Sequence, residues 1–323
     1  MLSVYTGGHH GISREADVAS AISQHRAVWI DLLEPTSEDE TLVENGLGID
    51  VPTREEMREI EPSSRFYDEN GALYMTATLV TRLDEDLPEA AQVTFILGNG
   101  FLVTNRYVDP LPFRRFAAQL ERGASGINTS GSVFAALMEA IVNRIADVIE
   151  RAASDLDGIS KEIFAASDGR RVRPDYEDVL ARVGQSGELI SKARESLGSL
   201  GRLLVFAQQN SLVPLPQDVL SRLRVVSRDV SQMADHAGFL GNKLAFILDA
   251  TLGMINFDQN NILKIFSVAT VVLLPPSVIG AIFGMNFAHL PWSQTHWGFG
   301  MTLGIMAVSA ILPVIYFKRR GWL

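Results

Sequence analysis

Two long uncharged stretches, residues 265–283 and 298–317, constrain this chain more than any other feature. They contain 19 and 20 residues, and neither includes Asp, Glu, Lys or Arg. A helix needs about 20 consecutive, mostly apolar residues to span the hydrocarbon core of a bilayer. No other stretch of the sequence meets this requirement. We therefore expect two transmembrane helices joined by a short extracytoplasmic loop, residues 284–297.

The charged residues are distributed as two such helices require. All 38 acidic residues lie at or before Asp258. Four of the 28 basic residues follow it: Lys264, Lys318, Arg319 and Arg320. Because Lys and Arg are enriched on the cytoplasmic side of membranes, both chain ends are expected in the cytoplasm beneath a bacterial-type inner membrane, with residues 318–323 as a basic tail. The acidic part of the chain favours cations as partners and disfavours nucleic acid.

Two features that the sequence lacks limit the kinds of site and the location expected for the N-terminal part. The sequence contains no cysteine, which excludes disulfides and thiolate metal sites and fits a reducing compartment. Residues 1–17 lack the apolar core of a signal peptide, so we expect the N-terminal part to stay in the cytoplasm. No permanently bound cofactor is predicted.

The N-terminal part, residues 1–131, has the pattern of an α+β domain. Asn70-Gly71 and Asn99-Gly100 interrupt its β-rich segments, and the second pair predicts a hairpin turn. Strands are expected in the segments rich in Val, Ile, Thr and aromatic residues: 27–33, 73–83 and 91–106.

From residue 132 the spacing of apolar residues changes to that of long helices. Breaks in this spacing predict three of them, over residues 132–166, 175–210 and 217–283. A shorter helix is expected earlier, beginning at Thr36. The last long helix is expected to cross from a cytoplasmic helical region, 132–261, into the first transmembrane segment, 262–283. Pro275 and Pro276 are expected to bend it.

Polar residues follow one face of the first predicted span. Spacings of seven, three, four and three residues place five residues, four of them polar, in one helical stripe: Asn260, Ser267, Thr270, Leu274 and Ser277. Polar side chains in a transmembrane helix usually face the interior of a bundle or a water-filled path. Serine and threonine also bond to the backbone of their own helix, and this alternative stays open. Because one helical hairpin cannot enclose a water-filled path, a pore requires several copies of the chain.

A short motif, Gly284-Met285-Asn286, stands directly after the first span, and basic residues follow the second span. This arrangement resembles the CorA family of divalent-cation transporters, whose signature is Gly-Met-Asn after the first of two C-terminal helices. The resemblance covers most of the chain. It implies a funnel-shaped homopentamer that takes up magnesium, and also cobalt or nickel, through a pore on the symmetry axis.

The resemblance further implies that intracellular magnesium regulates the pore. In the family, acidic residues that bridge the cytoplasmic domains of neighbouring subunits sense the ion. A divalent cation would then be both the transported and the regulatory ion. The candidate residues in this chain are Asp84, Asp86, Asp229 and Asp235.

The predicted pore contains no carboxylate, since no acidic residue follows Asp258. Magnesium gives up its water reluctantly, which favours outer-shell hydrogen bonds between amide or carbonyl oxygens and the hydrated ion. The Asn286 side chain and the Gly284 carbonyl are therefore expected to form the entry filter, with Met285 between them. A ring of Asn260 side chains is expected at the cytoplasmic end.

Several alternatives remain open. Leu263, Phe266 and Leu274 are candidates for an apolar gate, but they also fit ordinary helix packing. His289 in the connecting loop suits zinc, nickel or cobalt, and the ZntB zinc transporters, with proton-coupled transport, are the closest alternative family. A membrane-anchored sensor or scaffold is the alternative from another class. An enzyme is not expected, because the sequence has no Walker-type loop, His-Glu-x-x-His motif or nucleophile elbow.

Overall fold

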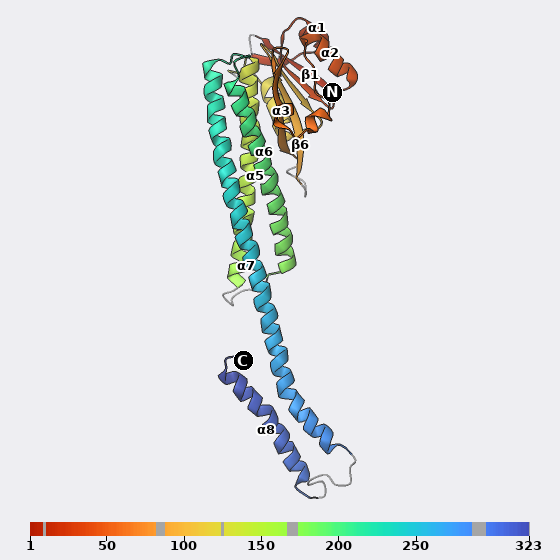
Figure 1. Cartoon of the computed structure of the whole chain (residues 1–323), viewed down its shortest axis with the longest axis vertical. Coiled ribbons are helices and arrows are strands. Elements are labelled where there is room, and N and C mark those ends of the chain that lie inside the picture. Colours follow the sequence, from red (N-terminus) through yellow and green to blue (C-terminus); the bar gives the residue numbers. More distant parts are fainter. Residues whose placement is uncertain (9–10, 82–87, 124–125, 167–173, 286–294, 323) are drawn as a thin grey trace. The chain divides into compact units, whose positions relative to one another are not determined.

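A mixed sheet organises the first of two compact units, Met1–Leu248, in the computed structural model (Figure 1). The structure describes residues 1–8, 11–81, 88–123, 126–166, 174–285 and 295–322. Within them the sheet has seven strands in the order β2-β1-β3-β7-β6-β5-β4, and only β3 and β7 pair in parallel. The strands are β1 (Leu2–Gly8), β2 (Gly11–Arg14), β3 (Ala27–Leu33), β4 (Phe66–Glu69), β5 (Ala72–Thr81), β6 (Glu89–Leu97) and β7 (Leu102–Arg106).

Helices cover both faces of this sheet. On one face, Ile22 of α1 and Val43 of α2 share a core with Ile30 of β3. On the other face, Phe95 of β6 packs against Phe113 of α4 and Phe134 of α5. The helical elements of this unit are α1 (Val18–Ser23), α2 (Ser37–Leu47), η1 (Glu56–Arg58), α3 (Pro62–Arg65), α4 (Leu111–Glu121), α5 (Ser130–Ala166), α6 (Tyr176–Gln209) and the first part of α7 (Gln217–Phe283). The predicted α+β fold is confirmed.

Local sequence signals set several of these boundaries. Thr36 caps α2: its hydroxyl accepts a hydrogen bond from the Asp39 backbone N–H, and the Asp39 carboxylate accepts one from the Thr36 N–H. Asn70 and Gly71 both have positive φ angles, 49° and 80°, as a type I′ turn requires. This turn joins β4 to β5, so the pair that the sequence marked as a break is itself a hairpin turn.

Helix α6 completes an edge of the sheet. Strand β4 pairs with β5 only from Ala72 to Met75, so the same edge of β5 lacks a strand partner further along. There the backbone N–H groups of Thr78 and Val80 donate to the hydroxyls of Ser199 and Ser196 on α6, at 2.9 and 3.4 Å. Buried N–H groups require such partners, and these two bonds fix α6 along the strand.

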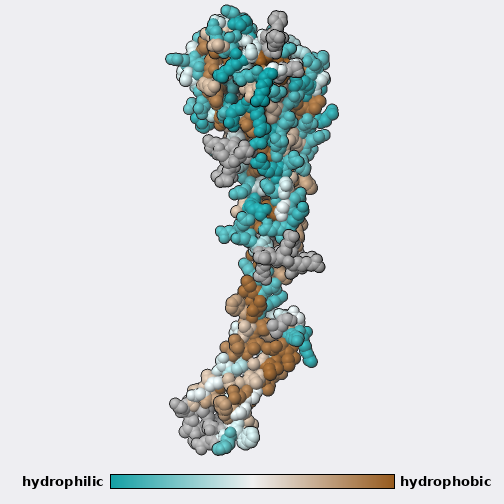
Figure 2. Space-filling model, turned by 180° about the vertical axis from the view of Figure 1, so that it is seen from behind, coloured by the Kyte–Doolittle hydropathy of each residue, from teal (hydrophilic) through white to brown (hydrophobic). Residues whose placement is uncertain are grey.

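Helix α7 runs unbroken from Gln217 to Phe283, as predicted, and so continues from the first unit into the second, Asp249–Leu323. Pro275 and Pro276 lie inside it. The second unit also contains α8 (Gly298–Arg319). Both helices are long and apolar enough to cross a membrane, and Figure 2 shows the largely hydrophobic surface of this unit in brown.

Candidate pore helix

The predicted polar stripe lies on the second-unit part of α7. At about 100° per residue, its members and the other two candidate gate residues, Leu263 and Phe266, fall within an arc of roughly 120°. All are exposed in the single chain: Asn260, Leu263, Phe266, Ser267, Thr270, Leu274 and Ser277. No titratable side chain lies among them.

Helix α8 covers the opposite side of α7. A Cβ atom on Gly280 would lie 3.4 Å from the Met306 Cε atom of α8, which is ordinary contact distance. The residues of α7 between 261 and 283 that are buried or half-buried lie roughly 100–180° from the centre of the stripe: Asn261, Val268, Val272, Pro275, Pro276, Ile279, Gly280 and Phe283. The stripe therefore faces away from the only other described helix of its unit.

Two hydroxyls of the stripe bond to their own helix. Thr270 donates to the Phe266 carbonyl and Ser277 to the Leu273 carbonyl, each at 2.8 Å. This is the alternative that the sequence left open. It does not remove the hydroxyls from a pore, because a hydroxyl that donates still has lone pairs that accept. The water shell of a cation presents hydrogen-bond donors, so acceptors are what a hydrated ion requires.

The candidate gate residues make little contact within the chain. Leu263, Phe266 and Leu274 are 62, 68 and 60% exposed. Packing inside one chain therefore does not account for them, and an apolar contact at these positions would need another copy or lipid.

The Gly-Met-Asn motif begins where α7 ends. Gly284 N–H donates to the Gly280 carbonyl at 2.9 Å, and Met285 N–H donates to the Ile282 carbonyl at 3.3 Å, which tightens the last turn. Asn286 and His289 lie outside the described residues, so the filter stays a prediction.

Two of the four candidate sensor residues lie in the described part of the chain. Asp84 and Asp86 lie outside the described residues. Asp229 and Asp235 are both exposed on α7. Their six-residue separation places them about 120° apart around the helix. Among the described residues no group of three or more His, Cys, Asp or Glu side chains is arranged to hold a metal ion.

One structured feature was not predicted. Lys318 and Arg319 of the predicted tail belong to α8, and the chain turns back on this helix at Gly321, whose φ angle is 72°. Glycine after basic residues at the end of a helix is a known stop signal, and the sequence contains it at this point. The prediction treated Lys318, Arg319 and Arg320 only as charges.

Comparison with known proteins shows to which family the chain belongs. A model of the family described as "CorA-like Mg2+ transporter protein" matches residues 24–319. The chain belongs to the CorA family. It is 33% identical over 298 residues to "Magnesium transport protein CorA" of Pasteurella multocida, covering 92% of each chain. It is 30% identical over 323 residues to the protein of that name in Salmonella typhimurium, covering 100% of each.

Solved structures agree with this fold. The complete CorA magnesium transporter of Methanocaldococcus jannaschii superposes with a TM-score of 0.78 at 18% identity and covers 100% of this chain and 99% of its own. The ZntB cytoplasmic domain of Vibrio parahaemolyticus gives a TM-score of 0.57 at 10% identity, over 80% of this chain and 98% of its own. Both the expected CorA family and its structural relation to ZntB are confirmed. This is a family of transporters, not enzymes.

Proposed function

We propose that this protein takes up magnesium across a bacterial-type inner membrane through a pore that several copies of α7 enclose. One observation carries the proposal: the polar stripe is exposed on α7 opposite the side that α8 covers. In a bilayer such a face is favoured where it meets water or the polar groups of other copies. A closed ring of chains with their stripes turned inward provides both.

The chemistry of the stripe supports a hydrated ion. It offers hydroxyl and amide oxygens and no carboxylate, so it attracts a cation without holding it tightly. Magnesium keeps its inner water shell more firmly than softer or larger cations do. Gly284 and Asn286 remain the proposed entry filter, and Asn260 the proposed inner ring. The relatives that carry the name of magnesium transport proteins support magnesium as the principal ion.

The family resemblance supplies the finer features of the proposal. The assembly is a homopentamer with both termini in the cytoplasm, cobalt and nickel are further ions, and intracellular magnesium closes the pore. The mass of the detergent-solubilised assembly tests the number of copies. To test the regulatory role, the internal magnesium concentration that halves the flux is measured. This concentration should rise when a candidate sensor residue is replaced by Asn. The candidates are Asp84, Asp86, Asp229 and Asp235.

Flux into proteoliposomes tests the pore directly. Ser267→Leu and Ser277→Leu place bulky apolar side chains in the stripe, and each should abolish most of the magnesium flux. Ala307→Leu is the matched control, since Ala307 is a small exposed residue of α8. Equal flux through Ser267→Leu and Ala307→Leu would show that the stripe does not line the path.

The same assay separates the alternatives. Magnesium, cobalt, nickel and zinc are compared with and without a proton gradient. Zinc preference with dependence on the gradient would replace the magnesium assignment with a ZntB-like one. Absence of flux for every ion would favour a membrane-anchored sensor.

A further inference from the structure

The chain beyond α8 forms an ordered cap. Gly321 N–H donates to the Lys318 carbonyl at 3.2 Å, and Trp322 N–H donates to the Phe317 carbonyl at 3.0 Å. These two bonds, with Gly321 in the left-handed region, define a Schellman motif. The Trp322 ring stacks on Phe317, with centroids 5.4 Å apart and planes 26° apart. We call residues 316–322 the α8 cap.

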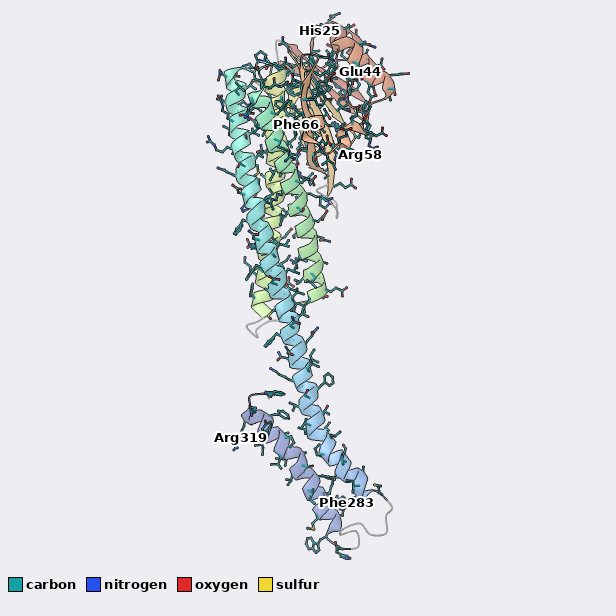
Figure 3. The ribbon with its side chains drawn as sticks, viewed as in Figure 1. His25, Glu44, Arg58, Phe66, Phe283 and Arg319 are labelled. Atoms are coloured by element: carbon teal, nitrogen blue, oxygen red, sulfur yellow. The ribbon has the colours of Figure 1, made fainter. Side chains whose placement is uncertain are left out.

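The α8 cap brings aromatic rings and cations to one place. The Arg320 guanidinium lies 5.7 Å from the centroid of the Tyr316 ring. Lys318 and Arg319 occupy the last turn of α8, and Figure 3 places Arg319 at this end of the helix. All three cations and Trp322 are exposed.

The cationic side chains of the cap do not bind the carbonyls at the end of α8. Lys and Arg at a helix end often bind its unpaired carbonyls. Here backbone N–H groups already bond those carbonyls: Arg320 N–H donates to Tyr316 and Phe317, and Gly321 N–H to Lys318. Within the described part of the chain, none of the three cationic side chains forms an ion pair. Their charge is available to a ligand.

The surface beside the cap is apolar. Ile311, Leu312 and Ile315 of α8 are 54, 62 and 47% exposed. A ligand that binds both the cations of the cap and this apolar surface has a phosphate at one end and hydrocarbon at the other. Aromatic rings are favoured at the depth of the headgroups, and guanidinium groups bind phosphate oxygens in pairs.

We propose that the α8 cap is a binding site for the headgroup of an anionic phospholipid, whose acyl chains lie along α8. The site is on α8, away from the stripe of α7, and does not depend on which ion is transported. A measurement of lipid binding therefore tests it separately from the proposed function.

The experiment uses the full-length protein in nanodiscs that contain brominated lipid, which quenches nearby tryptophan fluorescence. The difference between the parent protein and Trp322→Phe isolates the signal of Trp322. Brominated phosphatidylglycerol should quench this signal more than brominated phosphatidylcholine at the same mole fraction. Arg319→Gln and Arg320→Gln should each weaken the relative affinity for phosphatidylglycerol about fivefold, which is the equivalent of ~1 kcal/mol per cation near an anionic surface.

Two controls distinguish lipid binding by the ordered α8 cap from attraction of the lipid by net charge alone. Lys264→Gln removes one cation beside the other span and should leave the Trp322 signal unchanged. Gly321→Ala keeps every charge but disfavours the left-handed conformation, so it should weaken the preference, whereas Gly321→Asn should largely restore it, because Asn tolerates this conformation. Circular dichroism of each variant checks that α8 remains helical.

Three outcomes would overturn the proposal. The first is equal quenching by the two lipids. The second is an equal effect of Lys264→Gln and Arg320→Gln, which would mean that charge alone attracts the lipid. The third is loss of the preference in excess inorganic phosphate, which would identify a site for a soluble anion instead of a lipid.

Discussion

Arg106, at the end of β7, holds a positive charge that is almost completely buried. Its guanidinium donates to both carboxylate oxygens of Asp31, at 2.9 and 2.7 Å, and to Asp109 at 2.8 Å. Thr104 donates to the same Asp31 carboxylate and accepts from the Trp29 indole. Burial opposes the charge, but the hydrogen bonds from Arg106 to Asp31 and Asp109 raise the pKa of Arg106 above its ordinary value. This network joins the parallel pair β3 and β7.

Removal of Arg106 should therefore be costly. Arg106→Gln leaves the Asp31 carboxylate buried without its charge partner, which should lower the free energy of unfolding by about 3–5 kcal/mol. Urea unfolding of the full-length protein in detergent measures this. Arg114→Gln is the control: Arg114 also pairs with Asp109, at 3.4 Å, but it is largely exposed, so the loss should stay below about 1 kcal/mol. Similar losses for the two variants would contradict the structural role of Arg106.

Tyr67 gives a prediction for alkaline pH. Its ring stacks on Tyr74 with centroids 4.7 Å apart, and burial raises the pKa of Tyr67 from 10.0 to about 12. A raised pKa favours the folded state below pH 10.0, and this contribution is lost as the pH rises through about 12. Burial also raises the pKa of Tyr5, Tyr74 and Tyr107. Tyrosinate absorbance should therefore show several late ionisations, and Tyr67→Phe should remove one of them. Loss of an ionisation near pH 10.0 in this variant, instead of near pH 12, would show that Tyr67 ionises normally.

At the scale of elements, two glycines in helices should respond to alanine in opposite directions. A Cβ atom on Gly46 of α2 would lie 2.3 Å from the Ile22 Cγ2 atom, in the core between α1 and α2. Gly46→Ala should therefore cost about 1–3 kcal/mol from overpacking, although alanine favours a helix by up to ~1 kcal/mol. Gly184 of α6 has no atom within 4 Å of the same position, so Gly184→Ala should stabilise by about 0.5–1 kcal/mol. Thermal unfolding distinguishes them, and a shift of the same sign in both would be the contrary result.

The elements that the sequence predicted are those with local signals. The long helices have a sustained helical period, and α2 has its cap at Thr36. Strand β4 was missed because it is four residues long and reads Phe-Tyr-Asp-Glu; its pairing with β5 makes it a strand. Strand β2 was missed because it is also four residues long, and its pairing with β1 makes it a strand. Strand β1 has seven residues and was missed as well; its pairing with β2 and β3 defines it.

Some features of the candidate site could likewise be predicted from local sequence, and others could not. Helical spacing alone predicted the stripe from Asn260 to Ser277, because period is a local property. That the stripe lies opposite α8 depends on how two helices pack, and no spacing within one helix contains that information. The ordered cap at Gly321 had a sequence signal, glycine at a helix end, but its stacking of Trp322 on Phe317 is a tertiary contact.

At the scale of the whole molecule, the continuity of α7 is the feature with most consequence. The boundary between the compact units, Leu248 and Asp249, falls inside this helix. The proposed pore requires the stripe of every chain to face the axis of the ring. Each inserted residue rotates the downstream helix by about 100°, whereas seven residues return it to within roughly 20° of the original direction.

Insertions between Gly253 and Met254 test this requirement, since a Cβ atom on Gly253 would meet no atom within 4 Å. One inserted alanine turns the stripe toward lipid or α8 of a neighbouring copy, so most of the magnesium flux in proteoliposomes should disappear. Seven inserted alanines lengthen the stalk but nearly restore the direction of the stripe, and flux should recover in part. Thermal unfolding should remain close to that of the parent in both variants, because the core of the first unit lies upstream. Equal flux through the two variants would show that helical register along α7 does not determine conduction, and would remove the support that the stripe gives to the proposed pore.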